Sequence, residues 1–451
     1  MSRETVNNGR VLSPAMLASF GRDFAAVPAR RALMNAATHS GLTAAAYNRV
    51  AVARGRFTFS LELETGKVTD QKKSGRCWLF AGLNTLRHEF EKRHRVEFFE
   101  LSQSYLMFWD KLEKANYALE AYIATAADDI RDRTVMWLLD HPLEDGGQWD
   151  MFADLVRKYG IVPKGDMPES FASSDSRDMN RVLTSKVRAD AARLRAARAK
   201  GANEDTLRVL KAEMLNEIYR MLAVIMGEPP RTLDLEFRDK DKNYVRDAGF
   251  TPLDFYAKYF GRAMDDYVSV INAPTVDKPF GRTYTVEYLG NVVGGRGVLY
   301  LNVDFPVFRA LTLAQLQDGE PAWFGVDMGA MIDRDTGFMD EGLYDYGAAL
   351  DAPLAMTKAE RLDYGESRLT HAMVLTGVNV VDGIPQRWKV ENSWGDKAGN
   401  QGFFVMSDGW FEQYAYQVVI HKKHLSPEFL RALEEPPVVL PPWDPMGSLA
   451  G

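Results

Sequence analysis

The chain has 451 residues, of which 46% are hydrophobic and 26% charged, with a formal net charge of −7 at pH 7. This balance is typical of a soluble globular protein of about two or three domains, and the mildly negative charge argues against a protein whose main role is nucleic-acid binding. The single cysteine excludes an internal disulfide and favours a reducing, cytoplasmic location.

The amino-terminal region is predicted to be a helical extension, residues 1–56. Ser13 and Pro14 are typical of a helix start, and Gly41 of a stop. The first residues lack the apolar stretch of a signal peptide, and no apolar run approaches the roughly 18 residues that cross a bilayer. We therefore expect neither export nor a membrane contact.

Residues 57–170 are predicted to form a helical lobe that begins with a strand at 57–63. A helix is expected from Cys77 to about His94, because apolar residues recur there every three or four positions: Leu79, Leu83, Leu86 and Phe90. Ser102 is expected to cap the following helix, and Gly160 to end a helix that begins near Gln148.

A helical insertion is predicted at 171–265, and it contains a basic helix at 181–200. This stretch contains one acidic residue, Asp190, and seven basic residues: Arg181, Lys186, Arg188, Arg193, Arg195, Arg198 and Lys200. Such a run usually forms a solvated helix face, and the alternative is a weak nucleic-acid contact. The apolar stripe on the same helix predicts that its other side is buried.

The remainder of the chain is rich in predicted strands. Short β-branched and aromatic runs separated by Gly, Pro, Asn and Asp fill residues 266–425. A proline-rich arm follows at 426–451. The chain thus combines a helical half with a strand-rich half, and function often lies between two such halves.

Cys77 is predicted to lie at the first turn of its helix, preceded by the loop KKSGR. The positive end of a helix dipole lowers a cysteine pKa and favours the nucleophilic thiolate. The alternative is an inert, buried cysteine. A redox role is a further alternative, but the chain has no second cysteine to resolve an oxidised thiol.

Three other residues supply what a nucleophilic thiol needs. His371 opens an apolar strand and can act as the base, while Asn392 can accept the imidazole Nδ1 proton and fix the ring. Gln71 can donate its side-chain amide to an oxyanion. Trp394 could exclude water from the His371 to Asn392 bond. Each residue also has a structural interpretation, but the four together favour catalysis.

The segments QKKSGRCWLF, THAMVLTGV and WKVENSWG resemble the signatures of papain-type cysteine peptidases. The 294-residue separation of Cys77 and His371 exceeds the roughly 130–150 residues of papain and cathepsins. Together with the Ser-Gly-Arg-Cys-Trp form, this separation is similar to the bleomycin hydrolase and aminopeptidase C family. Further segments that resemble this family are DGGQWDM, YGIVPKGDMPES, WFGVDMG, KAERLDYGES and WDPMG.

The resemblance implies an α+β, papain-like two-lobed fold: a helical lobe, an antiparallel β-barrel-like lobe and a large helical insertion. It implies a cytoplasmic thiol aminopeptidase, assembled as a homohexamer, that acts on peptides without a cofactor or metal. In its terms Cys77 is the nucleophile, His371 the base and acid, Asn392 the orienting residue and Gln71 an oxyanion donor. Trp78 and Trp394 support them.

The family also implies that the carboxyl-terminal arm lies in the cleft, where Ala450 and Gly451 would anchor the substrate's amino terminus. Trimming of Gly451 by the enzyme itself would leave Ala450 as the last residue. Five prolines stiffen this arm as an extended segment: Pro436, Pro437, Pro441, Pro442 and Pro445. The alternative function is a non-catalytic papain-like module that binds peptides or nucleic acid.

Overall fold

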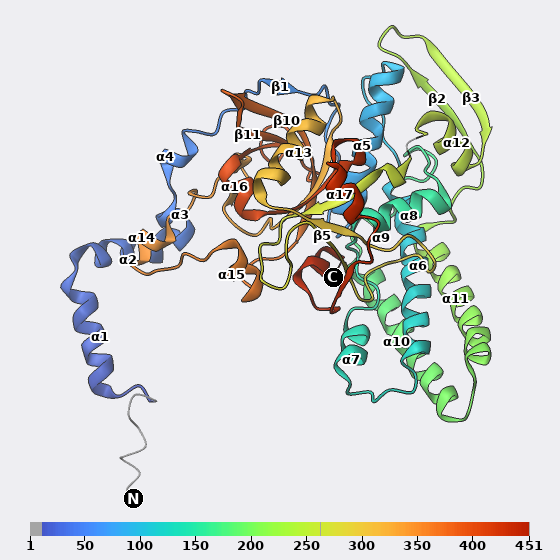
Figure 1. Ribbon diagram of the computed structural model, residues 1–451, viewed down its shortest axis with the longest axis horizontal. Helices are drawn as coiled ribbons and strands as arrows, with labels where there is room; N and C mark the ends of the chain where they lie inside the picture. The colour runs from blue at the N-terminus through green and yellow to red at the C-terminus, as the bar shows by residue number, and fades with distance from the viewer. Residues whose placement is uncertain (1–10, 262, 451) are drawn as a thin grey trace, which may run out of the picture.

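The computed structural model describes residues 11–261 and 263–450. It consists of a helical lobe and a strand-rich lobe. One hydrophobic core fills the helical lobe and continues onto strands of the other lobe, and a second lies within the strand-rich lobe. The carboxyl-terminal end of the chain lies where the two lobes meet, whereas the amino-terminal helices extend away from both lobes (Figure 1).

The helical lobe is built around the helix that carries the cysteine. Its helices are α5 (Cys77–His94), α6 (Gln103–Ala124), α7 (Arg133–Asp140) and α8 (Trp149–Tyr159). The predicted bounds of α5 are confirmed. The Ser102 side chain accepts the backbone N–H of Tyr105, and Gly160 ends α8 with a positive φ of 69°. Both signals follow from backbone groups that a helix leaves unpaired at its ends.

The insertion packs against α6. It contains α9 (Phe171–Ser174), α10 (Arg177–Ala199), α11 (Glu204–Met226), β2 (Leu233–Arg238), β3 (Tyr244–Phe250) and α12 (Pro252–Tyr259). The predicted basic helix is confirmed as α10, and its apolar stripe is buried. The β2–β3 hairpin was not predicted: β2 alternates apolar and charged residues, but most side chains of its partner β3 are exposed and follow no apolar alternation.

The strand-rich lobe is organised around one mixed sheet with the order β14-β5-β6-β4-β13-β7-β10-β11-β12-β9-β8. Its strands are β4 (Tyr267–Ile271), β5 (Arg282–Val286), β6 (Tyr300–Asn302), β7 (Ala322–Val326), β8 (Ile332–Asp333), β9 (Phe338–Met339), β10 (His371–Val381), β11 (Ile384–Glu391), β12 (Phe403–Ser407), β13 (Ala415–His421) and β14 (Val438–Leu440). Most pairings are antiparallel, and β14–β5, β4–β6 and β12–β9 are parallel.

Helices also accompany this sheet: α13 (Phe305–Gln317), α14 (Tyr346–Leu350), α15 (Lys358–Asp363), α16 (Asp408–Tyr414) and α17 (Pro427–Ala432), with short 3₁₀ turns at Met264–Asp266 and Lys422–His424. Strand β10 lies in the interior of the sheet, between β7 and β11: His371 pairs with Val326 of β7, and Val374 pairs with Glu391 of β11. His371, at the start of β10, and Asn392, directly after β11, therefore lie at the same end of adjacent strands.

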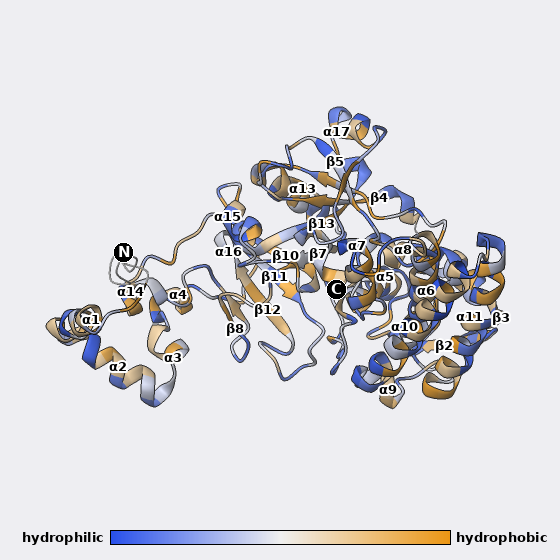
Figure 2. Cartoon of the chain, turned by 90° about the horizontal axis from the view of Figure 1, so that it is seen from below, coloured by the Kyte–Doolittle hydropathy of each residue, from blue (hydrophilic) through white to orange (hydrophobic). Residues whose placement is uncertain are grey.

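The amino-terminal region forms α1 (Pro14–Ala26), α2 (Pro28–Ser40), α3 (Leu42–Ala46) and α4 (Arg49–Val52). The side chains of α1 and α2 are exposed or half-buried, and Figure 2 shows both helices standing apart from the body. Pro28 separates the predicted helix into two, because proline lacks the N–H that a continuous helix requires. The predicted strand at 57–63 is reduced to β1 (Leu61–Glu62), which pairs with β10.

The carboxyl-terminal arm was predicted to be an extended segment, but only part of it is extended. After β14 it forms a 3₁₀ helix over Pro445–Ala450, in which Met446 and Leu449 are buried. The Asp444 carboxylate accepts the backbone N–H of Met446 at 2.9 Å, and the Ser448 hydroxyl donates to Pro445 O at 2.7 Å. These local bonds turn the chain. None of the helices in the described residues has the length and apolarity that crossing a membrane requires.

Candidate active site

Cys77 is the first residue of α5, and its side chain is buried, with 4% exposed. Its sulfur accepts a hydrogen bond from the backbone N–H of Ala372, the residue that follows His371 in β10. The indole Nε1 of Trp323 in β7 donates to Trp78 O at 3.2 Å. The start of α5 is thus held against the strands that carry His371, and residues 294 positions apart in the sequence become neighbours.

Burial raises the pKa of the Cys77 thiol to about 11. The backbone N–H groups of Ala372, Trp78 and Cys77 itself act in the opposite direction, but burial outweighs them. The sequence-based expectation of a lowered pKa is therefore wrong for this closed arrangement, because it counted the helix terminus and not the desolvation of the sulfur. Formation of the thiolate at neutral pH requires a nearby group that takes the proton.

His371 immediately precedes Ala372, whose backbone N–H reaches the Cys77 sulfur, and is itself buried, with 5% exposed. Its Nε2 is 2.8 Å from Asn392 Oδ1. The expected partner was Nδ1; the structure has Nε2 instead, because Asn392 follows the neighbouring strand β11 and reaches the ring nitrogen farther from the backbone. Burial lowers the pKa of His371 to about 4, opposed by the bond to Asn392 and reinforced by Arg334.

Trp394 covers the imidazole, with ring centroids 5.0 Å apart. The guanidinium of Arg334 in turn lies 4.5 Å from the centre of the Trp394 ring. An indole in this position keeps water away from the hydrogen bond between His371 and Asn392. Sequence reasoning did not identify Arg334, which lies in a loop without a recognisable motif.

Gln71 is fixed next to Asn392 through Ser393. The Gln71 backbone N–H donates to Ser393 O at 2.8 Å, and the Ser393 hydroxyl donates to Gln71 Oε1 at 2.6 Å. Gln71 Nε2 donates to Ser74 O at 2.7 Å. That bond uses one of the two amide protons, and the second remains on a side chain that is held in place from both ends. Ser393 was another residue that the sequence did not reveal.

Trp78 joins α5 to the loop at 144–147. Its Nε1 donates to Asp145 O at 2.8 Å, and the Asp145 carboxylate accepts the backbone N–H of Gly75 at 3.0 Å. Burial favours the neutral carboxyl, but Lys111, at 2.7 Å, outweighs it and holds the pKa of Asp145 well below its ordinary value. This ionic anchor fixes the loop that faces the carboxyl-terminal arm.

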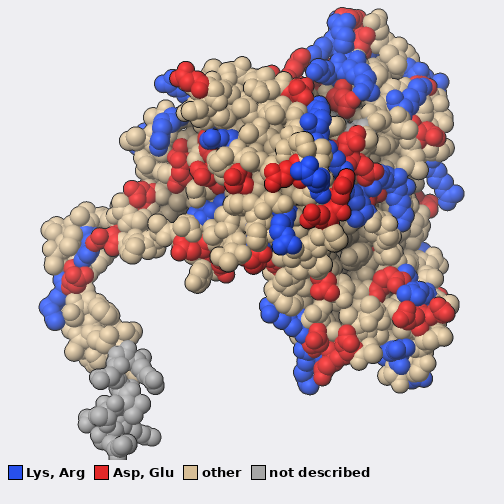
Figure 3. Space-filling view, viewed as in Figure 1, with Lys and Arg blue, Asp and Glu red and all other residues tan. Residues whose placement is uncertain are grey.

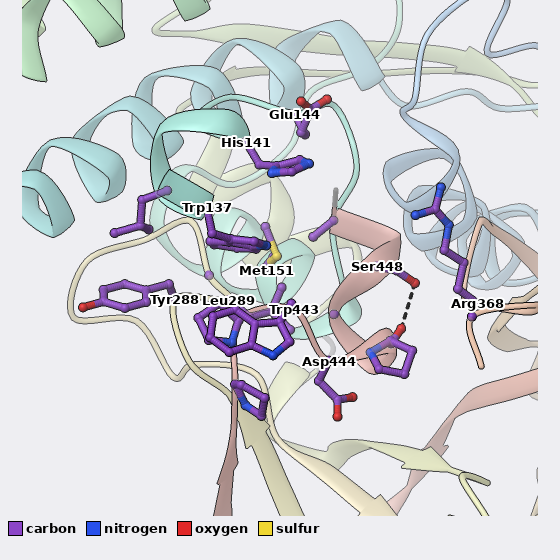
Figure 4. A pocket seen from close by; sticks show the side chains of 18 of the residues that line it. Trp137, His141, Glu144, Met151, Tyr288, Leu289, Arg368, Trp443, Asp444 and Ser448 are labelled. Atoms are coloured by element: carbon purple, nitrogen blue, oxygen red, sulfur yellow. Dashed lines mark hydrogen bonds between the residues drawn. The ribbon is translucent and has the colours of Figure 1, made fainter. Parts of the chain in front are cut away.

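The arm lies between the two lobes. A Cβ placed on Gly146 would be 2.0 Å from Leu449 O. The Ser448 hydroxyl shares its one proton between Pro445 O and Leu369 O, and the latter, two residues before His371, is 2.9 Å away. Ala450 lines an adjoining cavity of about 960 Å³, and Figure 4 shows Trp443, Asp444 and Ser448 of the arm among the residues that line it. Gly451, the other predicted anchoring residue, lies outside the described residues.

A buried ion pair connects the helix of Cys77 with the strand that leads to Asn392. Arg87 of α5 donates to Glu391 Oε1 at 2.6 Å, and these side chains are 2% and 1% exposed. Burial raises the pKa of Glu391, while Arg87 acts against this. Sequence reasoning missed this pair, because its members are distant in the chain and neither belongs to a catalytic signature.

The described residues contain no group of three or more His, Cys, Asp or Glu side chains placed to hold a metal ion. The site itself brings together a thiol, an imidazole and amide groups. Together these groups provide a nucleophile, an oriented base and a candidate oxyanion donor, which is the set that acyl transfer through a thioester requires.

Comparison with known proteins gives matches that span nearly the whole chain. The model of the Peptidase C1-like family matches residues 11–447. Aminopeptidase C of Listeria innocua is 49% identical, covering 96% of this chain and 98% of the relative, and that of Streptococcus thermophilus is 51% identical, covering 93% and 94%. The solved structure of PepW from Lactobacillus rhamnosis HN001 is 50% identical, with a TM-score of 0.96 over 97% of this chain and 99% of that one.

Proposed function

The chain belongs to the Peptidase C1-like family, and we propose that it is a thiol-dependent aminopeptidase that removes amino-terminal residues from peptides. The observation that carries this proposal is the Nε2 to Oδ1 bond of 2.8 Å between His371 and Asn392, with the backbone N–H of Ala372, the next residue after His371, donating to the Cys77 sulfur. The high similarity to proteins named aminopeptidase C supports the specificity for amino termini.

The reaction begins with attack of the Cys77 sulfur on the substrate carbonyl. Because Nε2 of His371 is held by Asn392, Nδ1 takes the thiol proton. The carbon–nitrogen bond then breaks, a thioester forms, and the Nδ1 proton passes to the leaving amine of the shortened peptide. Water attacks the thioester with His371 again as base, which releases the amino acid and restores the thiol.

Two groups stabilise the oxyanion that forms during each attack. The second amide proton of Gln71 Nε2 and the backbone N–H of Cys77 are the proposed donors. Loss of one such donor typically lowers the rate about 10²–10³-fold. Ser393 keeps the Gln71 amide in position, since its hydroxyl bonds Oε1 at 2.6 Å and leaves the nitrogen free to donate.

The arm provides the reason for cleavage at the amino terminus. Papain-like clefts are open at both ends, and here the residues up to Ala450 lie against both lobes on one side. Ala450 and Gly451 are the proposed anchors for the substrate's ammonium group. The arm would exclude peptides that extend farther in this direction, so acetylated peptides are expected to be poor substrates.

The nucleophile is tested with a free aminoacyl arylamide and the wild type, Cys77→Ala and alkylated wild type. Wild-type turnover should disappear on alkylation and be absent from Cys77→Ala. Turnover by Cys77→Ala at the wild-type rate would refute the mechanism. A second comparison uses free and acetylated peptides: deletion of residues 447–451 should raise hydrolysis of the acetylated one, and equal cleavage of both by the intact chain would contradict the role of the arm.

We also propose self-association as a homohexamer in the cytoplasm. A reducing compartment preserves the thiol that the reaction needs.

Helix α1 presents Leu17, Phe20 and Phe24 with 53%, 54% and 43% exposed, and Figure 3 shows few charged atoms over it. Such an apolar surface favours burial against another copy. Light scattering should give a hexamer, and a smaller species for Leu17→Ser/Phe20→Ser/Phe24→Ser. A stable wild-type monomer would refute the assembly.

The nucleic-acid contact considered for the basic helix has little support. Lys186 and Arg193 pair with Asp190 and Glu217. Arg188 donates to Leu139 O at 2.7 Å, and Arg195 to Thr125 O at 2.8 Å. These cations are engaged by the protein itself, so we propose a structural role for α10.

A further inference from the structure

The carboxyl-terminal arm is held by several contacts, and one of them is a buried ion pair. Asp444 Oδ2 lies 2.9 Å from Lys278 Nζ, with side-chain exposures of 5% and 3%. Two further polar contacts of the arm join neutral groups: Tyr300 Oη donates to Met446 O at 3.0 Å, and Gln148 Nε2 to the same oxygen at 3.4 Å. The ion pair is therefore the arm contact whose loss leaves a charge buried.

Lys278 is placed on a rigid support. It lies in the loop that follows β4, and Asn302 donates to Lys278 O at 2.6 Å and to Ala273 O at 3.0 Å. Asn302 is fully buried, so the loop cannot follow the arm if the arm moves. Burial lowers the pKa of Lys278, but Asp277 and Asp444 outweigh this and raise it above its ordinary value.

Asp444 has two separate tasks. Its Oδ1 accepts the backbone N–H of Met446 at 2.9 Å and so begins the 3₁₀ helix, while its Oδ2 meets Lys278. That helix carries Leu449 to Gly146 and Ser448 to Leu369. The position of the residues that block the cleft thus depends on an anchor several residues before them.

We propose that Lys278 is a positioning residue that sets substrate specificity: by holding Asp444 it keeps the arm docked and restricts hydrolysis to peptides with a free amino terminus. This inference rests on the proposed function. Lys278 acts through the arm and leaves the chemistry at Cys77 unchanged. Weakening the pair should therefore release the arm and admit longer or acetylated peptides, without loss of the thiol reaction.

The two single variants should differ in size of effect. Asp444→Asn removes the charge but keeps an oxygen for the Met446 N–H, and Lys278 retains Asp277, 2.8 Å away and 58% exposed. Lys278→Met leaves the Asp444 carboxylate buried without its cation, which is the more costly change. We expect the kcat/KM for an acetylated peptide to rise about tenfold or more in Lys278→Met, and less in Asp444→Asn.

The experiment measures kcat/KM for an aminoacyl arylamide and for an acetylated peptide in the wild type, both variants and the chain without residues 447–451. Lys186→Met is the matched control, since it breaks the pair with the buried Asp190 in the distant helix α10. Both variants should approach the truncated chain on the acetylated peptide. For the arylamide, whose ammonium group the arm is proposed to anchor, KM should rise while kcat is retained. Release of Leu449 and Ala450 by a carboxypeptidase should also become faster.

An unchanged ratio of the two activities in both variants, with a raised ratio in the truncated chain, would overturn the role of Lys278 and leave the arm as the block. An equal rise in Lys186→Met would overturn it as well, since the effect would then be general loosening. Unfolding of both single variants would identify the pair as a stability contact only. Failure of the proposed function is seen separately, as a wild type that does not hydrolyse the arylamide.

Discussion

Replacement of Arg87 by methionine should destabilise the protein and slow catalysis together. Its guanidinium lies 2.6 Å from Glu391 Oε1 at 2% and 1% exposure, and Glu91, also buried, is a second acid that it compensates. Removing one partner of such a pair typically costs about 3–5 kcal/mol. The upper part of that range is expected for Arg87→Met, because two buried carboxyl groups then lose their cation.

The partner substitution and the double variant give the pair its test. Glu391→Leu should cost less than Arg87→Met, because Arg87 keeps Glu91. Arg87→Met/Glu391→Leu should recover about 2 kcal/mol or more of the summed loss, since apolar replacement of a whole buried pair is often close to neutral. The control is Arg93→Met on the same helix, whose pair with Glu89 is 48% and 32% exposed; its cost should stay below about 1 kcal/mol.

The assay is urea unfolding followed by tryptophan fluorescence, combined with kcat/KM for the arylamide. In Arg87→Met the raised carboxyl pKa favours the protonated folded form, so the loss should be greater at pH 8 than at pH 5. Activity should fall because Glu391 immediately precedes Asn392. Additive losses in the double variant, or an Arg87→Met cost no larger than that of Arg93→Met, would refute the reasoning.

Three further outcomes follow from the site. The pKa of His371 is about 4 in the folded protein and about 6.5 in the unfolded chain, so the stability that its neutral form contributes is present above pH 6.5 and lost as the pH falls towards 4. Between these pH values the free energy of unfolding, measured in urea, should fall by about 3 kcal/mol less in His371→Gln than in the wild type. The rate of alkylation of Cys77 by a neutral reagent should rise near pH 4, where His371 becomes neutral and can act as a base, stay level, and rise again near pH 11, where the thiol itself ionises. A single rise near pH 8.5 would indicate an ordinary thiol. Gly146→Ala should displace Leu449 O, 2.0 Å from the new Cβ, and increase hydrolysis of acetylated peptides, whereas Gly165→Ala, with open space around it, should not.

The sequence was informative where the determinants are local. The apolar spacing after Cys77, the Ser102 cap and the Gly160 stop correctly predicted α5, α6 and α8, since helix ends depend on nearby residues. The β-branched runs likewise predicted most strands of the large sheet. The β2–β3 hairpin escaped prediction because most side chains of β3 are exposed and follow no apolar alternation, although Leu233 and Leu235 of β2 are buried.

The candidate site was predictable in its membership and not in its electrostatics. The segments around Cys77, His371 and Asn392 identify residues, but the ring nitrogen that Asn392 bonds depends on strand order. The raised pKa of Cys77 depends on how completely the two lobes cover it. Contacts such as Arg87 with Glu391 join residues more than 300 positions apart, so no local pattern contains them.

Consecutive residues of the arm grip opposite halves of the molecule. Trp443 lies under Arg133 of α7, 3.6 Å from the guanidinium carbon to the ring centroid, while the next residue, Asp444, pairs with Lys278 of the other lobe. The two halves therefore cannot pivot apart unless one grip opens. The two lobes should therefore keep a fixed relative position. A pair of spin labels, one on each lobe, should show a single narrow distance distribution that broadens only when the carboxyl-terminal arm is removed.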